Sequence, residues 1–418
     1  MNNENNRNAF KMTEIGWLPE EWEVVKLGDV SDLIMGQSPP GDTYNTAGQG
    51  MPFLQGKAEF TEISPRHIKY TTKPLKIAAM KSILISVRAP VGDVNISDRD
   101  YCIGRGLASI SLKEGSNNFL FYILKFYKKS LENEGYGSTF KAINRTKLEN
   151  FKIPLPSLSE QKKIAAVLSA VQEAREKTEA VIAAAKELKK SLMKYLFTYG
   201  PVPVTEADQV RLKETEIGVM PEEWGVAPIH KIGRIITGTT PRTNLREYYD
   251  GPYMFIAPGD IGNKVYVENT EKYLTEKGLR VSRPLPKNSV LVVCIGATIG
   301  KVALTKIDNC TTNQQINSII VSERNDPKFI YYSLSLRAPF LPLLAGRAAV
   351  PIVNKSNFAQ FKISLPNYCI QKKISEILFF LDQKIESEQS KKQALDQLFK
   401  SLLHNLMTGK IRVNHLEL

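Results

Sequence analysis

The sequence has few of the residues that mark whole classes of protein. Its 418 residues include four cysteines, without Cys-x-x-Cys spacing, and four scattered histidines, so neither a disulfide framework nor a common zinc pattern is expected. The longest apolar runs, such as 289–295 and 377–381, are far shorter than the ~20 residues that span a bilayer. The polar N-terminus lacks the basic-then-apolar order of a secretion signal. These absences predict a cytoplasmic protein.

The composition is otherwise globular, with an excess of positive charge. Hydrophobic residues make up 42% and charged residues 24%, which permits large cores in two to four domains of ~100–200 residues each. Lysine and arginine number 56 against 43 acidic residues, a net charge of +13. Basic side chains neutralise phosphates and release counterions, so the excess favours a polyanionic partner, although a basic protein without one has the same composition.

The chain contains a long internal repeat. The segment 13–22 returns as 215–224 at an offset of 202 residues, and 151–156 returns as 361–366 at an offset of 210. Further pairs, in the same order, are 36–40 with 238–242, 82–85 with 289–292, 161–164 with 371–374, and 188–192 with 398–402. The offset drifts while the order holds, as insertions into surface loops would cause. Two copies of one half are predicted, each a globular domain followed by a helix.

Local patterns predict an α+β fold. Short β-rich runs at 82–87 and 291–295 and helical stretches at 118–131 and 327–336 indicate a mixed α/β domain with a twisted sheet in each half. Two such domains are joined by two long antiparallel coiled-coil helices, and a pseudo-two-fold axis relates the halves. The predicted segments are a first globular domain at 1–156, a central helix at 157–200, a second globular domain at 201–366 and a C-terminal helix at 367–418.

The two helical regions carry apolar residues at heptad spacing. Neither glycine nor proline occurs between Ser157 and Phe197, and ~40 residues of helix make a rod of ~60 Å. The predicted spacer seam consists of Ile164, Val167, Val171, Val181, Leu188, Leu192, Ile374, Ile377, Leu381, Leu395, Leu398 and Leu402. Pairing of the two helices is favoured over the alternative of two amphipathic helices that each pack on their own domain. By the repeat, the region near Lys410 should lie close to Thr13, and a circular permutant opened near Pro203 should fold.

Motifs for catalysis are scarce. Gly296 to Lys301 resembles a phosphate-binding loop, but it has one residue too few between the glycines, and Val302 replaces the hydroxyl residue that would bind Mg²⁺. A tight turn between two strands is the favoured interpretation, and an NTPase built around Gly296–Lys301 is the alternative. The sequence contains no Gly-x-Ser-x-Gly, no His-Glu-x-x-His and no Asn/Asp-Pro-Pro-Tyr/Phe. No catalytic residue is predicted.

The loops do contain side chains suited to DNA. Arginine forms a bidentate fork with guanine, asparagine and glutamine do the same with adenine, and lysine, serine and threonine bind phosphates. The candidates are Gln37, Ser38, Lys57, Arg88, Arg105, Ser138, Thr139, Lys141, Asn144, Thr239, Arg242, Lys301, Asn313, Gln314, Arg347, Asn354 and Lys355. For each one, a solvent-facing loop residue is the alternative. Because Gly104-Arg105 aligns with Asn313-Gln314, two DNA-reading domains should read different sequences.

The whole arrangement resembles the specificity subunit of type I restriction-modification systems. The resemblance rests on the motif Gly16-x-x-Pro-x-x-Trp22 before residues 27–29 and on residues 153–156, which end the globular segment, followed by residues 161–164. The second copies of these motifs support it as well. It covers essentially the whole chain. Each motif is weak alone, whereas the ordered pair of halves is specific.

The resemblance implies a non-catalytic subunit that reads a bipartite, asymmetric target in double-stranded DNA. Each globular domain would be a target recognition domain, and the paired helices would set the spacing of the half-sites. Two modification subunits would methylate adenine N6 with S-adenosylmethionine, and, in systems that have them, two restriction subunits would add ATP- and Mg-dependent translocation and cleavage. This chain would hold no cofactor itself.

Further expectations concern the helices and the alternative functions. A four-residue insertion in both helices, ~6 Å, should lengthen the DNA spacer by about a base pair or two. A fragment ending near Pro203 should dimerise through its helix and act on a symmetric target. An NTPase would hydrolyse ATP without partners, and a coiled-coil scaffold without a DNA role would show no sequence-selective retention on DNA.

Overall fold

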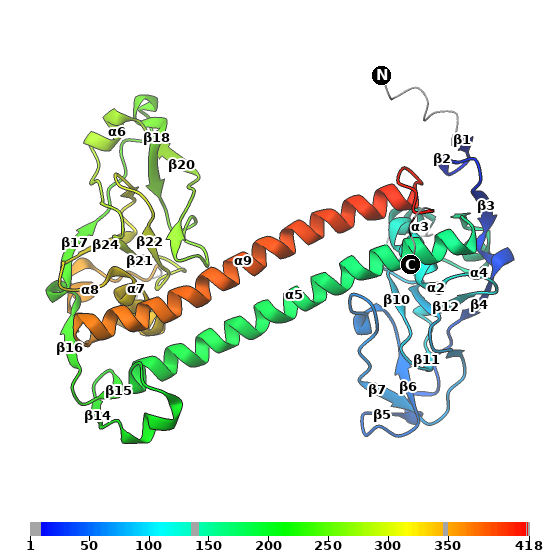
Figure 1. Ribbon diagram of the computed structural model, residues 1–418, viewed down its shortest axis with the longest axis horizontal. Helices are drawn as coiled ribbons and strands as arrows, with labels where there is room; N and C mark the ends of the chain where they lie inside the picture. Colours follow the sequence, from blue (N-terminus) through cyan, green and yellow to red (C-terminus); the bar gives the residue numbers. More distant parts are fainter. Residues whose placement is uncertain (1–9, 135–141, 346–349, 415, 417–418) are drawn as a thin grey trace. The chain divides into compact units, whose positions relative to one another are not determined.

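The computed structural model describes residues 10–134, 142–345, 350–414 and 416, and the chain forms two compact units. Unit 1 comprises Met1–Lys177 with Lys392–Leu418, and unit 2 comprises Thr178–Lys391. Each unit contains one globular domain and parts of both long helices, α5 (Leu158–Tyr199) and α9 (Tyr368–Met407) (Figure 1). Because the units divide each helix, the four segments predicted from the sequence stay a prediction. Within the described ranges, no helix is both long and apolar enough to cross a membrane.

The globular domain of unit 1 is built on two small sheets. One sheet has the order β10-β9-β12-β4 and is antiparallel, and the other has the order β5-β7-β6-β11-β8, with β6 and β11 parallel. A hairpin, β1–β2, and a separate pair, β3–β13, complete it. The strands are β1 (Phe10–Thr13), β2 (Gly16–Pro19), β3 (Glu23–Lys26), β4 (Ser31–Met35), β5 (Tyr44–Asn45), β6 (Met51–Leu54), β7 (Lys69–Thr71), β8 (Ile77–Ala78), β9 (Ile83–Ser86), β10 (Val94–Ile96), β11 (Tyr101–Ile103), β12 (Leu107–Leu112) and β13 (Lys152–Leu155).

The described part of this domain contains the short helices α1 (Leu27–Val30), α2 (Asn117–Phe126), α3 (Lys128–Glu134) and α4 (Arg145–Asn150). The predicted helix at 118–131 is therefore two helices. The Ser116 hydroxyl begins α2 by accepting a hydrogen bond from the amide of Phe119 at 3.3 Å. The buried residues of α2 share one core with the sheet and with α5 and α9. This helix thus ties the domain to the long helices.

Unit 2 repeats this plan. Its sheets have the orders β17-β24-β21-β22-β19 and β20-β18-β23, beside the hairpin β14–β15 and the pair β16–β25. The elements are β14 (Leu212–Thr215), β15 (Gly218–Pro221), β16 (Gly225–Pro228), β17 (Gly233–Thr237), β18 (Tyr249–Ile256), β19 (Tyr266–Val267), β20 (Lys272–Leu274), β21 (Val290–Val293), β22 (Val302–Thr305), β23 (Thr311–Thr312), β24 (Ile316–Val321), β25 (Lys362–Leu365), α6 (Glu276–Arg280), α7 (Pro327–Arg337) and α8 (Lys355–Gln360).

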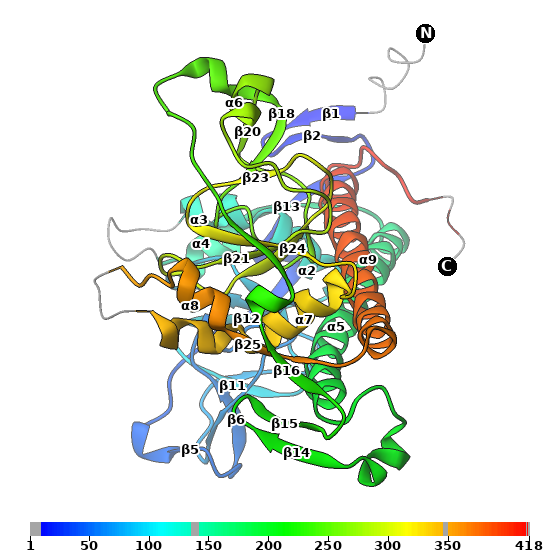
Figure 2. The same ribbon diagram turned by 90° about the vertical axis from the view of Figure 1, so that its left-hand side faces the viewer.

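The strand pairings confirm the internal repeat. In unit 1, β12 lies between β4 and β9, and in unit 2, β24 lies between β17 and β21, antiparallel in every case. The parallel pair β6–β11 corresponds to β18–β23. The helix predicted at 327–336 is α7, which Asp326 caps, and it lies between the sheet and the long helices as α2 does (Figure 2). The fold is α+β, as predicted.

Inside each unit the two long helices pair antiparallel. In unit 1, Arg175 on α5 bonds to Asp396 on α9 at 2.6 Å, and Glu160, nearer the start of α5, bonds at 2.7 Å to Arg412, which follows the end of α9. The numbering therefore rises along α5 as it falls along α9. In unit 2, Lys189 lies 2.5 Å from Asp382. Both helices also share a core with the globular domain of each unit. The alternative, in which each helix packs only on its own domain, is wrong.

The predicted seam needs a correction of phase. Ile164 and Ile374 are fully buried, and Val167, Val171, Leu192 and Leu402 pack against the cores, but Val181, Leu188, Ile377 and Leu398 are exposed by 38–54%. Next to three of these exposed positions, the buried side chain stands one residue later, at Ile182, Leu378 and Phe399. An α-helix drifts relative to a strict seven-residue repeat, and each helix must face both its partner and the helix of a globular domain. Polar residues consequently lie inside the seam, among them Gln172 and Thr178.

The chain segment after α9 lies against the N-terminal hairpin of unit 1. A Cβ at Gly409 would stand 2.2 Å from the ring of Pro19, and Nη2 of Arg412 lies 2.5 Å from a carboxylate oxygen of Glu21. The predicted proximity of the region near Lys410 to the start of the first domain is confirmed. Folding of the circular permutant stays a prediction.

Candidate nucleic-acid interface

In unit 1, several loops meet at one edge of the antiparallel sheet. Strand β4 ends, β12 begins and β9 ends at this edge, because β12 runs antiparallel to both neighbours. The amide of Gly36 donates to the carbonyl of Leu107, and the amide of Gln37 donates to the carbonyl of Ile103, both at 2.9 Å. A Cβ at Gly36 would lie 2.2 Å from the carbonyl oxygen of Gly104, so only glycine fits this approach.

Unit 2 makes the same junction from different residues. The amide of Gly238 donates to the carbonyl of Ile316 at 3.0 Å, and the amide of Thr239 donates to the carbonyl of Thr312 at 2.9 Å. A Cβ at Gly238 would lie 2.1 Å from the carbonyl oxygen of Asn313. The backbone therefore requires glycine at both equivalent positions, whereas the side chains around it are free to differ.

A second pair of hydrogen bonds extends the junction in both units. In unit 1, the amide of Val87 donates to the carbonyl of Gly106, and the amide of Ile143 donates to the carbonyl of Val87, both at 2.9 Å. In unit 2, the amide of Cys294 donates to the carbonyl of Gln315, and the amide of Val353 donates to the carbonyl of Cys294, both at 2.8 Å. We call this arrangement the loop junction. It comprises residues 36–40, 87–92, 103–106 and 142–144 in unit 1, and 238–242, 294–300, 312–315 and 351–354 in unit 2.

Replacing Gly36 by alanine tests this geometry. The new Cβ would collide with the Gly104 carbonyl, so the loop must move and lose the hydrogen bond of the Gln37 amide to Ile103. Hydrogen exchange at Gln37 should become at least tenfold faster. Gly41→Ala is the matched control, because a Cβ at Gly41 meets no atom within 4 Å. Equal exchange in both variants would show that the close approach is not needed.

Most sequence-predicted candidates lie at the loop junctions. Unit 1 places Gln37, Ser38, Arg88, Arg105 and Asn144 there, and the Oγ of Ser38 accepts a hydrogen bond from the amide of Arg105 at 3.3 Å. Unit 2 places Thr239, Arg242, Asn313, Gln314 and Asn354 there, with Lys301 and Lys355 adjoining. Ser138, Thr139, Lys141 and Arg347 lie outside the described residues.

Several candidates are engaged within the protein. The side chains of Asn144 and Asn354 cap α4 and α8 by accepting from the amides of Lys147 and Asn357 at 2.9 and 2.7 Å. The ammonium group of Lys57 lies 2.6 Å from a carboxylate oxygen of Asp93. These contacts give each side chain a structural role, and contact of these residues with DNA stays a prediction.

Two arginines in the unit 1 junction are available to a ligand. Arg88 and Arg105 are exposed, and within the described part of the chain no hydrogen bond or ion pair engages either guanidinium group. In unit 2, the residue at the place of Arg105 is Gln314, whose Oε1 accepts a hydrogen bond from the Thr240 hydroxyl at 2.5 Å. The unit 1 junction is cationic at this point, and the unit 2 junction presents a neutral, oriented amide.

Sequence reasoning missed Gln55 of unit 1. This exposed residue directly follows β6, and its backbone lies within 3.2 Å of a Cβ built at Gly104. The parallel pairing of β6 with β11 brings it to the junction. Nothing in the local sequence indicates that pairing, so no sequence signal could have placed Gln55 there.

The turn from Gly296 to Gly300 joins two antiparallel strands, β21 and β22, which confirms the favoured interpretation. The ammonium group of Lys301 donates to the carbonyl of Ile261 at 2.9 Å. A phosphate-binding lysine would instead point toward the loop. The geometry gives no support to a nucleotide site at this turn.

Buried thiols are the remaining chemically reactive groups of note. Burial raises the pKa of Cys294 and of Cys310 to about 11 and raises the pKa of Cys102 above its ordinary value. These thiols stay protonated at neutral pH and are poor nucleophiles. Among the described residues, no group of three or more His, Cys, Asp or Glu side chains is arranged to hold a metal ion.

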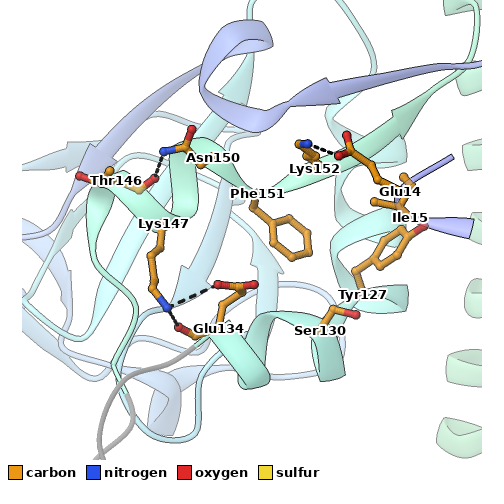
Figure 3. Close-up of a pocket in the computed structure, with 10 residues that line it drawn as sticks. All are labelled: Glu14, Ile15, Tyr127, Ser130, Glu134, Thr146, Lys147, Asn150, Phe151 and Lys152. Atoms are coloured by element: carbon orange, nitrogen blue, oxygen red, sulfur yellow. Dashed lines mark hydrogen bonds and ion pairs between the residues drawn. The ribbon is translucent and has the colours of Figure 1, made fainter.

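A cavity of about 670 Å³ in unit 1 is lined by residues outside the loop junction (Figure 3). Glu14 and Ile15 beside the hairpin, Tyr127, Phe151 and residues of α3 and α4 line it. Lys152 pairs with Glu14, and Lys147 lies 3.4 Å from a carboxylate oxygen of Glu134. Because these lysines have acidic partners in the protein, the cavity is a weaker candidate for binding phosphates than the junction.

Comparisons with known proteins agree with this architecture. The family model of the type I restriction modification DNA specificity domain matches residues 19–186 and 221–397. The type I restriction enzyme MjaVIII specificity subunit of Methanocaldococcus jannaschii is 27% identical over 417 residues, which cover 96% of this chain and 95% of that one. The putative MjaX specificity subunit of the same organism is 52% identical over 194 residues, which span 46% of each chain.

A solved structure shows the same fold. The crystal structure of a type I restriction-modification S subunit from M. genitalium superposes with a TM-score of 0.65 at 17% identity, covering 92% of this chain and 96% of that one. The two matches to the family model correspond to the two halves of the sequence repeat. With two copies of the DNA specificity domain, this chain belongs to the family of type I restriction-modification specificity subunits.

Proposed function

We propose that this chain reads a bipartite, asymmetric DNA target, with one half-site bound at each loop junction, and so directs adenine-N6 methylation and restriction by partner subunits. Membership of the specificity family supports DNA recognition. The observation that carries the proposal is the pair of junctions, which share one backbone hydrogen-bond pattern but present Arg105 in unit 1 and Gln314 in unit 2.

The two side chains favour different bases. The guanidinium fork of arginine matches O6 and N7 of guanine, whereas the amide of glutamine matches N6 and N7 of adenine. Arg105 would therefore read a guanine in one half-site, and Gln314, oriented by Thr240, would read an adenine in the other. Arg88 adds positive charge to the unit 1 junction, where it would position a phosphate. Unequal half-sites follow from this difference.

The partners and cofactors belong to the same proposal. Two modification subunits would supply S-adenosylmethionine and the methyltransferase chemistry, and restriction subunits, where the system has them, would supply ATP- and Mg-dependent translocation and cleavage. This chain would hold none of these cofactors. The turned-away amine of Lys301 supports a recognition role over the alternative NTPase.

A substitution at Arg105 tests the assignment. The chain is co-expressed with its modification subunits, and N6-methyladenine is mapped by long-read sequencing. Arg105→Gln, which copies unit 2, should change one base pair in one half-site from guanine to adenine and leave the other half-site intact. Arg105→Ala should relax that position at a cost of about 1–3 kcal/mol in discrimination.

Arg99→Ala is the matched control, because this exposed arginine precedes β11, whereas Arg105 follows it. The control should methylate the original target. Methylation of that target by all three variants would reject the role of Arg105. Absence of sequence-selective methylation with the wild-type chain would reject the proposed function itself, and ATP hydrolysis by the purified chain without partners would favour the NTPase alternative.

A further inference from the structure

The helix pair in unit 1 contains a cluster that mixes charge and aromatic rings. The guanidinium group of Arg175 on α5 donates to Asp396 on α9 at 2.6 Å and to Gln172 at 2.5 Å. Its carbon lies 4.9 Å from the ring centroid of Phe399, and the ammonium group of Lys125 lies 5.7 Å from the same centroid. Phe399 is 5% exposed. The ring therefore takes part in two cation–π contacts in a nearly dry setting.

Desolvation already acts against the charge of Lys125. Burial lowers the pKa of this lysine, Arg175 lowers it further, and Glu62, at 3.6 Å, opposes the shift. Further positive charge next to Lys125 and Arg175 would therefore be unfavourable. Asp396 supplies negative charge, and Phe399 supplies a neutral π face.

In unit 2, the equivalent place has the opposite chemistry. By the offset of 210 residues, Lys189 of α5 corresponds to Phe399 of α9, and Gln172 corresponds to Asp382. The ammonium group of Lys189 lies 2.5 Å from Asp382 and 5.4 Å from the ring centroid of Tyr332. The hydroxyl of Tyr332 donates to the second oxygen of Asp382 at 2.6 Å. Lys189 is thus paired with a carboxylate and an aromatic ring in unit 2.

The repeat also shows what a second copy of α5 would bring to unit 1. Its apolar residues Leu192 and Leu196 would replace Leu402 and Leu406 without loss. Lys186 would replace Asp396, however, and Lys189 would replace Phe399. Arg175 and Lys125 would then face two lysines in place of a carboxylate and a ring. Positive charges placed next to one another in a partly buried site repel strongly.

We infer that Asp396 and Phe399 are pairing determinants: they make unit 1 select α9 and reject α5 of a second copy of this chain. The apolar positions Leu402 and Leu406 would accept either helix, because Leu192 and Leu196 match them across the repeat. Within the two helices, selection depends on the charge cluster, and beyond α9 the ion pair of Arg412 with Glu160 adds to it. This device keeps two unlike halves together in one molecule and prevents symmetric assemblies of the first half. The inference rests on the helix contacts and is independent of the proposed DNA role.

The test transfers the two α5 residues onto α9 in the full chain. In the double variant Asp396→Lys/Phe399→Lys, amides of α9 within residues 392–407 should exchange at least tenfold faster, and the first thermal transition should fall by at least ~5 °C. Amides at 368–391, which pack in unit 2, serve as an internal reference. The control Gln393→Lys/Gln397→Lys adds positive charge at two exposed positions of the same helix and should behave as the wild type.

A third substitution distinguishes repulsion from general disruption. Adding Arg175→Asp to the double variant restores opposite charges at the pair formed by positions 175 and 396, so protection of 392–407 should recover by at least half. If the amides of residues 392–407 exchange at the wild-type rate in the double variant, the inference is overturned, because unit 1 would then accept α5-like residues. Failure of the third substitution to improve folding or protection would overturn it as well. Where the double variant yields no folded protein, recovery of folded triple variant supports it.

Discussion

Replacing Arg412 by alanine is expected to lower the free energy of unfolding of unit 1 by about 3–5 kcal/mol, because the Glu160 carboxylate would stay buried without its cation. Glu160 is 4% exposed, and its oxygens accept hydrogen bonds from Nε and Nη2 of Arg412 at 2.7 and 3.1 Å. It also accepts from Nε1 of the buried Trp22 at 3.0 Å. The Glu160 and Glu21 carboxylates raise the pKa of Arg412 above its ordinary value, so this guanidinium is charged at any working pH.

Urea unfolding followed by hydrogen exchange measures this effect in unit 1 separately, because a chain of two units need not unfold in one step. Lys410→Ala, at an exposed neighbouring position, is the matched control. A second variant removes the whole pair: Glu160→Ile/Arg412→Met places at position 160 the residue that unit 2 has there, Ile370. It should recover part of the loss, since a buried ion pair can be replaced by apolar residues at little cost, whereas Nε1 of Trp22 loses its acceptor. Unchanged stability of Arg412→Ala would show that the pair does not hold the C-terminal segment.

A fragment that ends near Pro203 should dimerise far more weakly than its apolar seam suggests. In a dimer of this fragment, Arg175 would face Lys186 and Lys189 of the other copy in place of Asp396 and Phe399. Both ends of the helix pair would suffer this repulsion. The fragment with Lys186→Asp/Lys189→Phe should dimerise with a Kd at least ~100-fold lower, about tenfold from each end, or 1.4 kcal/mol per end.

Sedimentation equilibrium of the two fragments measures the difference. Lys190→Asp/Lys194→Ala makes the same change in net charge at exposed positions of α5 and should leave the dimer as weak as in the unchanged fragment. Equal dissociation constants for all three fragments would contradict the charge argument. Tight dimerisation of the unchanged fragment would restore the simpler expectation, drawn from the heptad pattern, that any two of these helices pair.

Several features of the fold follow from local sequence. The repeat, the two long helices and the mixed α/β domains are visible as matched motifs and as long stretches without glycine or proline. The alignment of Arg105 with Gln314 also holds, because equivalent backbone hydrogen bonds surround both positions. Helix 118–131 was predicted as one element but is two, α2 and α3, since the local pattern does not show the break at Tyr127.

The phase of the helix seam was decided by tertiary structure. A heptad pattern tells which residues are apolar, whereas the face that is buried depends on every element packed against the helix. Helices α2 and α7 pack on the long helices, so the face of each long helix that is buried is shifted by one residue. Leu188 and Leu398 are left exposed, whereas Phe399 is buried and Lys189 is half-buried. A charged residue is not expected in a seam until its partner, here Asp382, is known.

The sequence by itself determined that this protein consists of two related halves with one long helix each. Tertiary structure alone decided which side chains share a junction, as for Gln55 beside Gly104, and which charges pair between α5 and α9. The physical reason is that repeats and helix propensity depend on residues near one another in the chain. Hydrogen bonds and ion pairs between residues more than a hundred positions apart depend on packing that no local pattern encodes.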